Sequence, residues 1–136
     1  MADVGRHSEL LGEILETLPL WKVKGTSFRI NAWKANTGAA HYQEKSRVKV
    51  TAAGQRIEIP GKERFVQFGR KGQADITGLI PPHGRRIEIE GKTGDQKPND
   101  DQRKFLREVR DFGGIAIVAY RVSDVRAELL KEGVIE

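Results

Sequence analysis

Hydrophobic residues recur at helical spacing in the first segment of the chain. Leu10, Leu11, Ile14, Leu15 and Leu18 fall on one stripe, while three glutamates share the opposite face. The pattern predicts a helix over residues 8–18, with Ser8 as the N-cap and Pro19 marking the end.

A second helical pattern follows in "PNDDQRKFLREVRDFGG" (residues 98–114). Its apolar stripe consists of Phe105, Leu106, Val109 and Phe112. Asn99 or Asp100 is expected to cap the start, and Gly113 or Gly114 to end the helix. The apolar run at 115–120 predicts a strand covered on both faces, and residues 123–131 predict a short last helix.

Alternation with period two predicts strands at residues 27–33, 64–69, 74–80 and 85–92, with a loop at 34–40. Residues 47–59 predict a basic hairpin that turns near Gly54, and "PPHG" joins the strands at 74–80 and 85–92. A right-handed helical crossover from residues 88–92 to 115–120 implies that those two strands are parallel. The chain is therefore predicted to be a mixed α/β single domain, with a basic hairpin insertion at about 42–62.

Two strands flank the PPHG turn, and their expected register pairs specific charged residues. With Pro81–Gly84 as a four-residue loop, the numbers of opposed residues sum to 165. Ile76 then meets Ile89 on an apolar face. On the other face Asp75 lies opposite Glu90, with Lys92 one step further on, whereas Glu88 lies opposite Thr77.

This charged row has two readings. It is either a solvated outer face, as is normal for antiparallel pairs, or a site. Two carboxylates on opposed residues repel unless a cation lies between them, and Mg²⁺ or Mn²⁺ prefers such oxygen ligands. Lys92 beside the pair can orient a water or neutralise a phosphate, which is the minimum apparatus for metal-assisted phosphodiester hydrolysis.

Composition narrows the class of protein. The 136 residues contain no cysteine, which excludes disulfides and thiol catalysis. With no signal peptide or apolar run long enough to cross a membrane, a cytoplasmic protein without membrane contacts is expected. The net charge is +5, and residues 45–73 hold eight Lys or Arg but only two Glu. This basic middle indicates either a polyanion partner such as nucleic acid or merely a solubilising surface.

The charged row also carries a resemblance. Asp75 and "EGK" at 90–92 are similar to the D…(D/E)xK signature of the PD-(D/E)xK nuclease superfamily. The longer run, with "RFVQFG", "ADITGLI", the ExK strand, Gln102, "GG" and "RVSDV", resembles the virus-type replication-repair nuclease (VRR-NUC) family. "ELLGEILETL" and "AWKANTGAA" resemble the family's opening helix and a following segment, so the likeness covers most of the chain outside about 42–62.

The resemblance implies a restriction-endonuclease-like core and a role for each matching residue. Asp75 and Glu90 would bind Mg²⁺ or Mn²⁺ with the Gly91 carbonyl, and Lys92 would be catalytic. Glu9 would complete the acidic site, with Glu13 one turn away as its rival, and Gln102 would face the same cleft. Glycine weakens a strand, so Gly91 leaves the aim of Lys92 open.

As a stand-alone domain, the chain resembles the viral and prophage members of the family, which implies a homodimer that cuts branched DNA such as four-way junctions. No small-molecule cofactor is expected. DNA contacts are expected from Asn36, Lys45, Arg47, Lys49, Arg56, Lys62, Arg64, Arg70 and Lys71. A nonspecific or flap-directed nuclease, an inactive DNA-binding module and an RNA-cleaving effector remain as alternatives. Asn36 is also a plain turn former. The three histidines show no ligand-like spacing.

Overall fold

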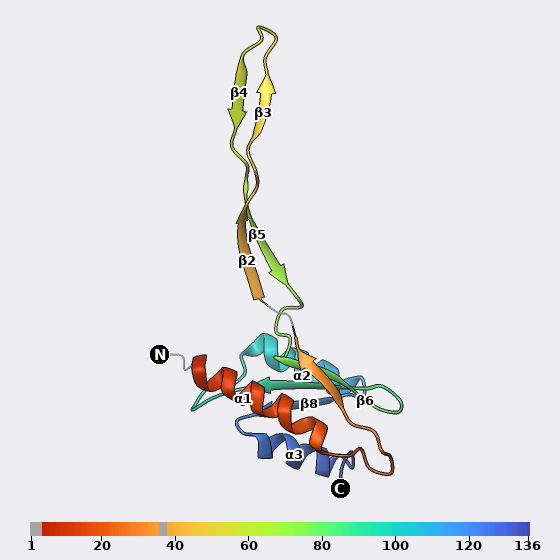
Figure 1. Cartoon of the computed structure of the whole chain (residues 1–136). Coiled ribbons are helices and arrows are strands. Elements are labelled where there is room, and N and C mark those ends of the chain that lie inside the picture. Colours follow the sequence, from red (N-terminus) through yellow and green to blue (C-terminus); the bar gives the residue numbers. More distant parts are fainter. Residues whose placement is uncertain (1–3, 36–37) are drawn as a thin grey trace. The chain divides into compact units, whose positions relative to one another are not determined.

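A computed structural model of the chain (Figure 1) describes residues 4–35 and 38–136, without the side chains of 38–42 and 64–68. The chain divides into two compact units. The first consists of Met1–Asn36 and Arg70–Glu136, and the second of Thr37–Gly69. Residues 42–62, predicted as a basic insertion, lie within the second unit.

The first unit is built on a four-stranded mixed sheet. Its elements are α1 (Val4–Thr17), the short 3-10 helix η1 (Leu18–Leu20), β1 (Asn31–Lys34), β6 (Ile76–Ile80), β7 (Arg85–Gly91), α2 (Asp100–Asp111), β8 (Ile115–Ala119) and α3 (Val122–Lys131). The strand order is β1-β6-β7-β8. β7 and β8 are parallel, as the crossover argument predicts, and the other pairs are antiparallel. The α/β class is thus confirmed.

Helices cover both faces of this sheet. On one face, Ile14 of α1 and Val125 of α3 are buried in a cluster that includes Ile89 of β7. On the other face, Phe105, Leu106 and Val109 of α2 pack with Ala74 and Ala116. The predicted apolar stripes of the first two helices therefore supply the two cores, except for Phe112, which is exposed.

The predicted register across the PPHG turn is confirmed. Ile76 pairs with Ile89 and Thr77 with Glu88. The pairing places Ile87 and Ile89, both fully buried, on the face covered by α1 and α3. Glu88 and Glu90 consequently point to the face that α2 covers.

The second unit contains two antiparallel strand pairs that follow one another along the same ribbon (Figure 1). β2 (Gly38–Gln43) pairs with β5 (Glu63–Phe68), and β3 (Arg47–Val50) pairs with β4 (Arg56–Ile59). The predicted turn near Gly54 is confirmed. Gly54 has a φ of 79°, a conformation that glycine adopts at little cost.

Several predicted boundaries are wrong. Helix α1 begins at Val4, so Ser8 lies inside the helix and does not cap it. The loop predicted over residues 34–40 includes the start of β2 at Gly38. The strand predicted at residues 27–33 is displaced to β1, with only an isolated bridge between Lys22 and Arg29 before it.

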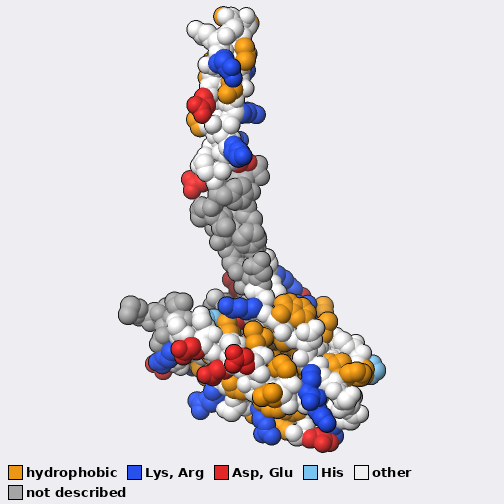
Figure 2. All heavy atoms as spheres, viewed as in Figure 1, with side chains coloured by type: hydrophobic (Ala, Val, Ile, Leu, Met, Phe, Trp, Pro, Cys, Tyr) orange, Lys and Arg blue, Asp and Glu red, His pale blue; other side chains and the backbone are white. Residues whose placement is uncertain are grey.

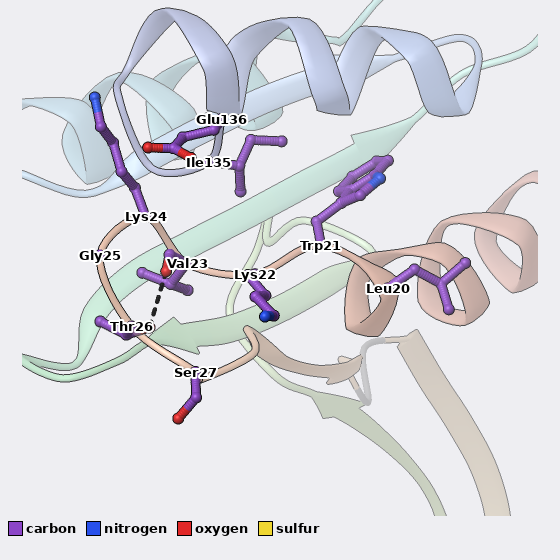
Figure 3. A pocket seen from close by; sticks show the side chains of 10 residues that line it. All are labelled: Leu20, Trp21, Lys22, Val23, Lys24, Gly25, Thr26, Ser27, Ile135 and Glu136. Atoms are coloured by element: carbon purple, nitrogen blue, oxygen red, sulfur yellow. Dashed lines mark hydrogen bonds between the residues drawn. The ribbon is translucent and has the colours of Figure 1, made fainter.

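The segment after η1 closes against the end of the chain and forms a pocket (Figure 3). The Lys24 N–H donates to the Val134 carbonyl at 2.8 Å, and Thr26 Oγ1 donates to the Val23 carbonyl at 2.9 Å. Lys22, Lys24 and Glu136 are the charged residues that line this pocket. It contains none of the predicted site residues. Among residues 4–35 and 38–136, no helix is long and apolar enough to span a membrane.

Candidate active site

Asp75 stands at the point where β6 begins, and its side chain reaches the end of β7. Its main-chain carbonyl accepts a hydrogen bond from Ala35 N–H at 2.8 Å, which fixes the backbone. Its Oδ2 accepts the Gly91 N–H at 2.9 Å. The strand ends thus bring together Asp75 and the residue whose carbonyl the resemblance assigns to the metal.

Glu90 is buried beside Asp75, with an exposed fraction of 3%. Its Oε1 accepts a hydrogen bond from Gln102 Nε2 at 3.1 Å, whereas its Oε2 is buried without a hydrogen-bond partner. The pKa of Glu90 is raised from 4.5 to about 7: burial raises it most, the negative charge of Asp75 raises it as well, and Lys92 opposes both effects. An unpaired buried oxygen of this kind costs roughly 1–3 kcal/mol.

The interpretation of this strand face as solvated is wrong. Glu88 is fully buried, and Glu90 nearly so, because α2 lies over them. Glu88 is held by Thr77 Oγ1 at 2.7 Å and by Arg86 Nε at 2.5 Å, both on its Oε1. These contacts turn Glu88 toward Thr77, in line with the predicted choice of Glu90 as the partner of Asp75.

Lys92 follows directly after β7 and lies next to Glu90. Its Nζ is 3.4 Å from Glu90 Oε1, and its side chain is 14% exposed. The Lys92 N–H donates to the Ala119 carbonyl at 2.9 Å, which continues the pairing with β8 beyond the glycine. The backbone around Gly91 is therefore held on both sides, and the Lys92 ammonium lies at the Glu90 carboxylate.

Close packing explains the glycine at position 91. A Cβ there would lie 2.8 Å from Leu11 Cδ2 and 3.5 Å from Leu10 Cδ2. Both leucines are buried on α1. Gly91 thus lets α1 approach the end of β7, close to Asp75.

Gln102 connects Glu90 to the start of α2. It forms a capping box with Asn99: the Gln102 N–H donates to Asn99 Oδ1, and the Asn99 N–H donates to Gln102 Oε1, both at 2.9 Å. With its oxygen committed to the cap, the amide must present Nε2 to Glu90. The helix cap therefore sets the orientation of this contact.

His7 is a contact of the site that sequence reasoning missed. Its Nε2 lies 3.1 Å from Asp75 Oδ2 and 3.1 Å from the Gly91 carbonyl oxygen. His7 is 68 residues from Asp75 and 84 from Gly91 along the chain, so no local spacing announces the contact. The only available signal was its helical phase with Leu10 and Leu11, three and four residues later.

Glu9 and Glu13 are both exposed on α1. They line a small pocket with Thr93, the residue after Lys92, and with Tyr120. On a helix, Glu9 is rotated about 200° from His7, which points at Asp75. The structure thus places Glu9 beside the site, whereas His7 is the α1 residue whose side chain contacts Asp75. A metal-binding role for Glu9 stays a prediction.

The residues predicted to contact DNA lie in both units. Lys45, Arg47, Lys49, Arg56 and Lys62 are exposed in the second unit. Figure 2 shows blue Lys and Arg side chains along the described part of its strands. In the first unit Arg70 pairs with Glu108, lowering the pKa of that carboxyl, and Lys71 Nζ lies 3.5 Å from Asp101. Asn36 and the side chain of Arg64 lie outside the described residues.

The residues at the strand ends fit a hard divalent cation. Asp75 and Glu90 supply carboxylates, and Gly91 supplies a carbonyl. Glu90 Oε2, which has no hydrogen-bond partner, is available as a metal ligand. Over the described ranges, no three His, Asp or Glu side chains group as a metal site. Mg²⁺ does not require such a group, because it binds through one or two carboxylates and keeps several waters.

Comparisons with known proteins add no family assignment. No model of a protein family matches the chain, and no curated protein matches it.

Proposed function

We propose that the protein is a metal-dependent DNA endonuclease with a PD-(D/E)xK-type core, which hydrolyses phosphodiester bonds. The observation that carries this proposal is the meeting of four groups at the ends of β6 and β7. These are the Asp75 and Glu90 carboxylates, the Lys92 ammonium and the Gly91 carbonyl, which lies 3.1 Å from the same His7 nitrogen as Asp75 Oδ2. The negative charge of Asp75 raises the pKa of Glu90, after the larger effect of burial, as expected of a carboxylate pair that a cation would stabilise.

Mg²⁺ or Mn²⁺ held by Asp75, Glu90 and the Gly91 carbonyl would polarise the scissile phosphate and acidify a bound water. The residues of the chain supply the remaining requirements. Lys92 Nζ, mostly buried next to Glu90, donates hydrogen bonds to a phosphate oxygen or to the attacking water and neutralises developing charge. Gln102 donates to one oxygen of Glu90, and the other oxygen, buried without a hydrogen-bond partner, would be free to bind the ion.

The second unit supports a DNA substrate through its composition. Its strands β3 and β4 expose basic side chains together with Val48, Val50 and Ile57. A two-stranded ribbon fits the major groove of a duplex, and exposed Lys and Arg release counterions from phosphates. Branched DNA, such as a four-way junction, is the proposed substrate class. Action as a homodimer would allow two symmetric incisions.

Cleavage of a substrate panel tests the proposal. The wild type and Asp75→Asn are each incubated with four substrates: a four-way junction, a flap, a linear duplex and a matching RNA. Each reaction contains Mg²⁺, Mn²⁺ or EDTA. We expect metal-dependent cutting of DNA by the wild type alone, fastest on the junction. Equal behaviour of the two proteins on every substrate would refute the enzyme, whereas equal cutting of all DNA shapes would refute only the preference for branches.

A further inference from the structure

One imidazole nitrogen in the candidate site converges on two predicted metal ligands. His7 Nε2 lies 3.1 Å from both Asp75 Oδ2 and the Gly91 carbonyl oxygen. A carbonyl oxygen can only accept, so Nε2 carries a proton in this arrangement and shares it between two oxygens. A positively polarised N–H therefore points at the oxygens that a cation would bind.

The distances among these atoms also match a coordination sphere. An octahedral ion with bonds of about 2.0–2.2 Å places neighbouring ligand atoms about 2.8–3.1 Å apart. Both separations from His7 Nε2 are 3.1 Å, so the nitrogen and either oxygen are spaced as neighbouring ligands of one ion would be. Binding would need the neutral tautomer with its proton on Nδ1, so Nε2 would release its proton to solvent and, where the ring starts neutral, Nδ1 would take one up from solvent.

The packing of α1 against the end of β7 holds His7 close to Asp75 and Gly91. Leu10 and Leu11, the residues three and four positions after His7, are buried and would meet a Cβ at Gly91. Their packing and the contact of His7 use the same face of the helix. His7 is thus the residue of α1 that the fold directs to Asp75.

We infer that His7 is a third protein ligand of the divalent ion, and that its imidazole favours Mn²⁺ over Mg²⁺. This inference rests on the proposed function, because it concerns the same ion. The preference follows from ligand chemistry, since Mg²⁺ binds almost only oxygen, whereas Mn²⁺ belongs to the first-row transition ions that also bind nitrogen sites, although more weakly than the ions after it. The described side chains do not group as a metal site without the ion, so the ion would draw the His7 nitrogen and oxygens from Asp75, Glu90 and Gly91 together as it binds.

Electron spin-echo envelope modulation of bound Mn²⁺ detects a directly coordinated ¹⁴N nucleus. The measurement needs no catalytic turnover. The wild type, His7→Ala and His83→Ala are each titrated with Mn²⁺ alone. His83 is exposed in the turn between β6 and β7, so its variant is the matched histidine control. His7 lies within α1, where alanine is a good helix former, and circular dichroism verifies the fold of each variant.

The wild type and His83→Ala should show ¹⁴N modulation, which His7→Ala lacks while still binding Mn²⁺. Loss of a ligand should weaken Mn²⁺ binding at least on the order of tenfold, as loss of an outer-sphere partner already does. Mg²⁺ binding, measured by competition, should weaken less. Bound Mn²⁺ without ¹⁴N modulation in the wild type, or with modulation that persists in His7→Ala, would overturn the inference.

The same samples separate failure of the inference from failure of the proposed function. If Mn²⁺ binds through oxygens alone and the wild type cuts DNA, only the role of His7 is wrong. If the wild type binds Mn²⁺ no better than Asp75→Asn and does not cut DNA, the nuclease proposal and the inference both fall.

Discussion

Gln102 Nε2 donates a hydrogen bond to Glu90 Oε1 across 3.1 Å, while the other end of the same amide caps helix α2. One side chain therefore links the start of a helix to the carboxylate at the end of β7. This link makes Gln102 a positioning residue, whose two roles can be separated by mutation.

Gln102→Ala and Asn99→Ala each remove one bond of the capping box, but only Gln102→Ala removes the donor to Glu90. Both variants should lose about 1 kcal/mol of unfolding free energy. Gln102→Ala should additionally weaken Mn²⁺ binding on the order of tenfold, as expected for an outer-sphere partner. Urea unfolding and Mn²⁺ titration measure the two effects. Equal Mn²⁺ affinities in the two variants would assign Gln102 a capping role alone.

Glu90 should make the metal-free protein less stable as the pH rises. Folding raises its pKa from 4.5 to about 7, so between these values the folded state holds a proton that the unfolded state has lost. This contribution to stability is present below about pH 4.5 and is lost as the pH rises to about 7. Glu90→Gln does not titrate, so in EDTA its unfolding free energy should rise relative to the wild type across this range. A difference that stays constant with pH would contradict the assignment.

Gly91→Ala should destabilise the protein, because its Cβ would lie 2.8 Å from Leu11 Cδ2. Overpacking of this kind costs about 1–3 kcal/mol. Gly12→Ala is the matched control: it lies within α1 with nothing within 4 Å of a new Cβ, and should stabilise by up to about 1 kcal/mol. Leu11→Ala should cost less in the Gly91→Ala background, which thermal unfolding of the double mutant measures. Additive effects would mean that the two residues do not compete for space.

The second unit should govern the salt dependence of DNA binding. Arg47 and Lys49 are exposed on β3, and replacing both by alanine should reduce the slope of log K against log salt by up to about 2, at about 0.9 for each phosphate contact. Arg126→Ala with Lys131→Ala removes the same charges from α3 and should leave the slope unchanged. Fluorescence anisotropy of a labelled junction gives both slopes. Equal slopes in the two double variants would mean that Arg47 and Lys49 do not contact DNA phosphates.

The strand framework of the site was predictable from local pattern. The four-residue loop at PPHG and the need to match Ile76 with Ile89 fix the register, and that register selects Glu90 over Glu88. The helical stripe and Asn99 cap likewise identify α2. These features depend on residues close together in sequence, where periodicity carries the information.

Long-range contacts account for what the sequence did not predict. The burial of Glu88 and Glu90 depends on α2 folding over a charged strand face, which the alternation alone reads as solvent-exposed. His7 meets Asp75 only because α1 extends to Val4 and packs against Gly91. Because Ser8 is a good capping residue by type, the sequence predicted that the helix begins there, and His7 was placed outside it.

The central claim is that Lys92 and its carboxylate neighbours hydrolyse DNA. Its most direct test is single-turnover cleavage of a labelled four-way junction in Mg²⁺ by the wild type, Lys92→Ala and Lys97→Ala. Lys97 is an exposed lysine five residues further on and controls for loss of charge. Lys92→Ala should bind the junction but cut it at least about 100-fold more slowly, the effect expected of a lost charge-stabilising donor, while Lys97→Ala cuts at the wild-type rate. Cleavage by Lys92→Ala at the wild-type rate, or no metal-dependent cleavage by the wild type, would contradict the claim.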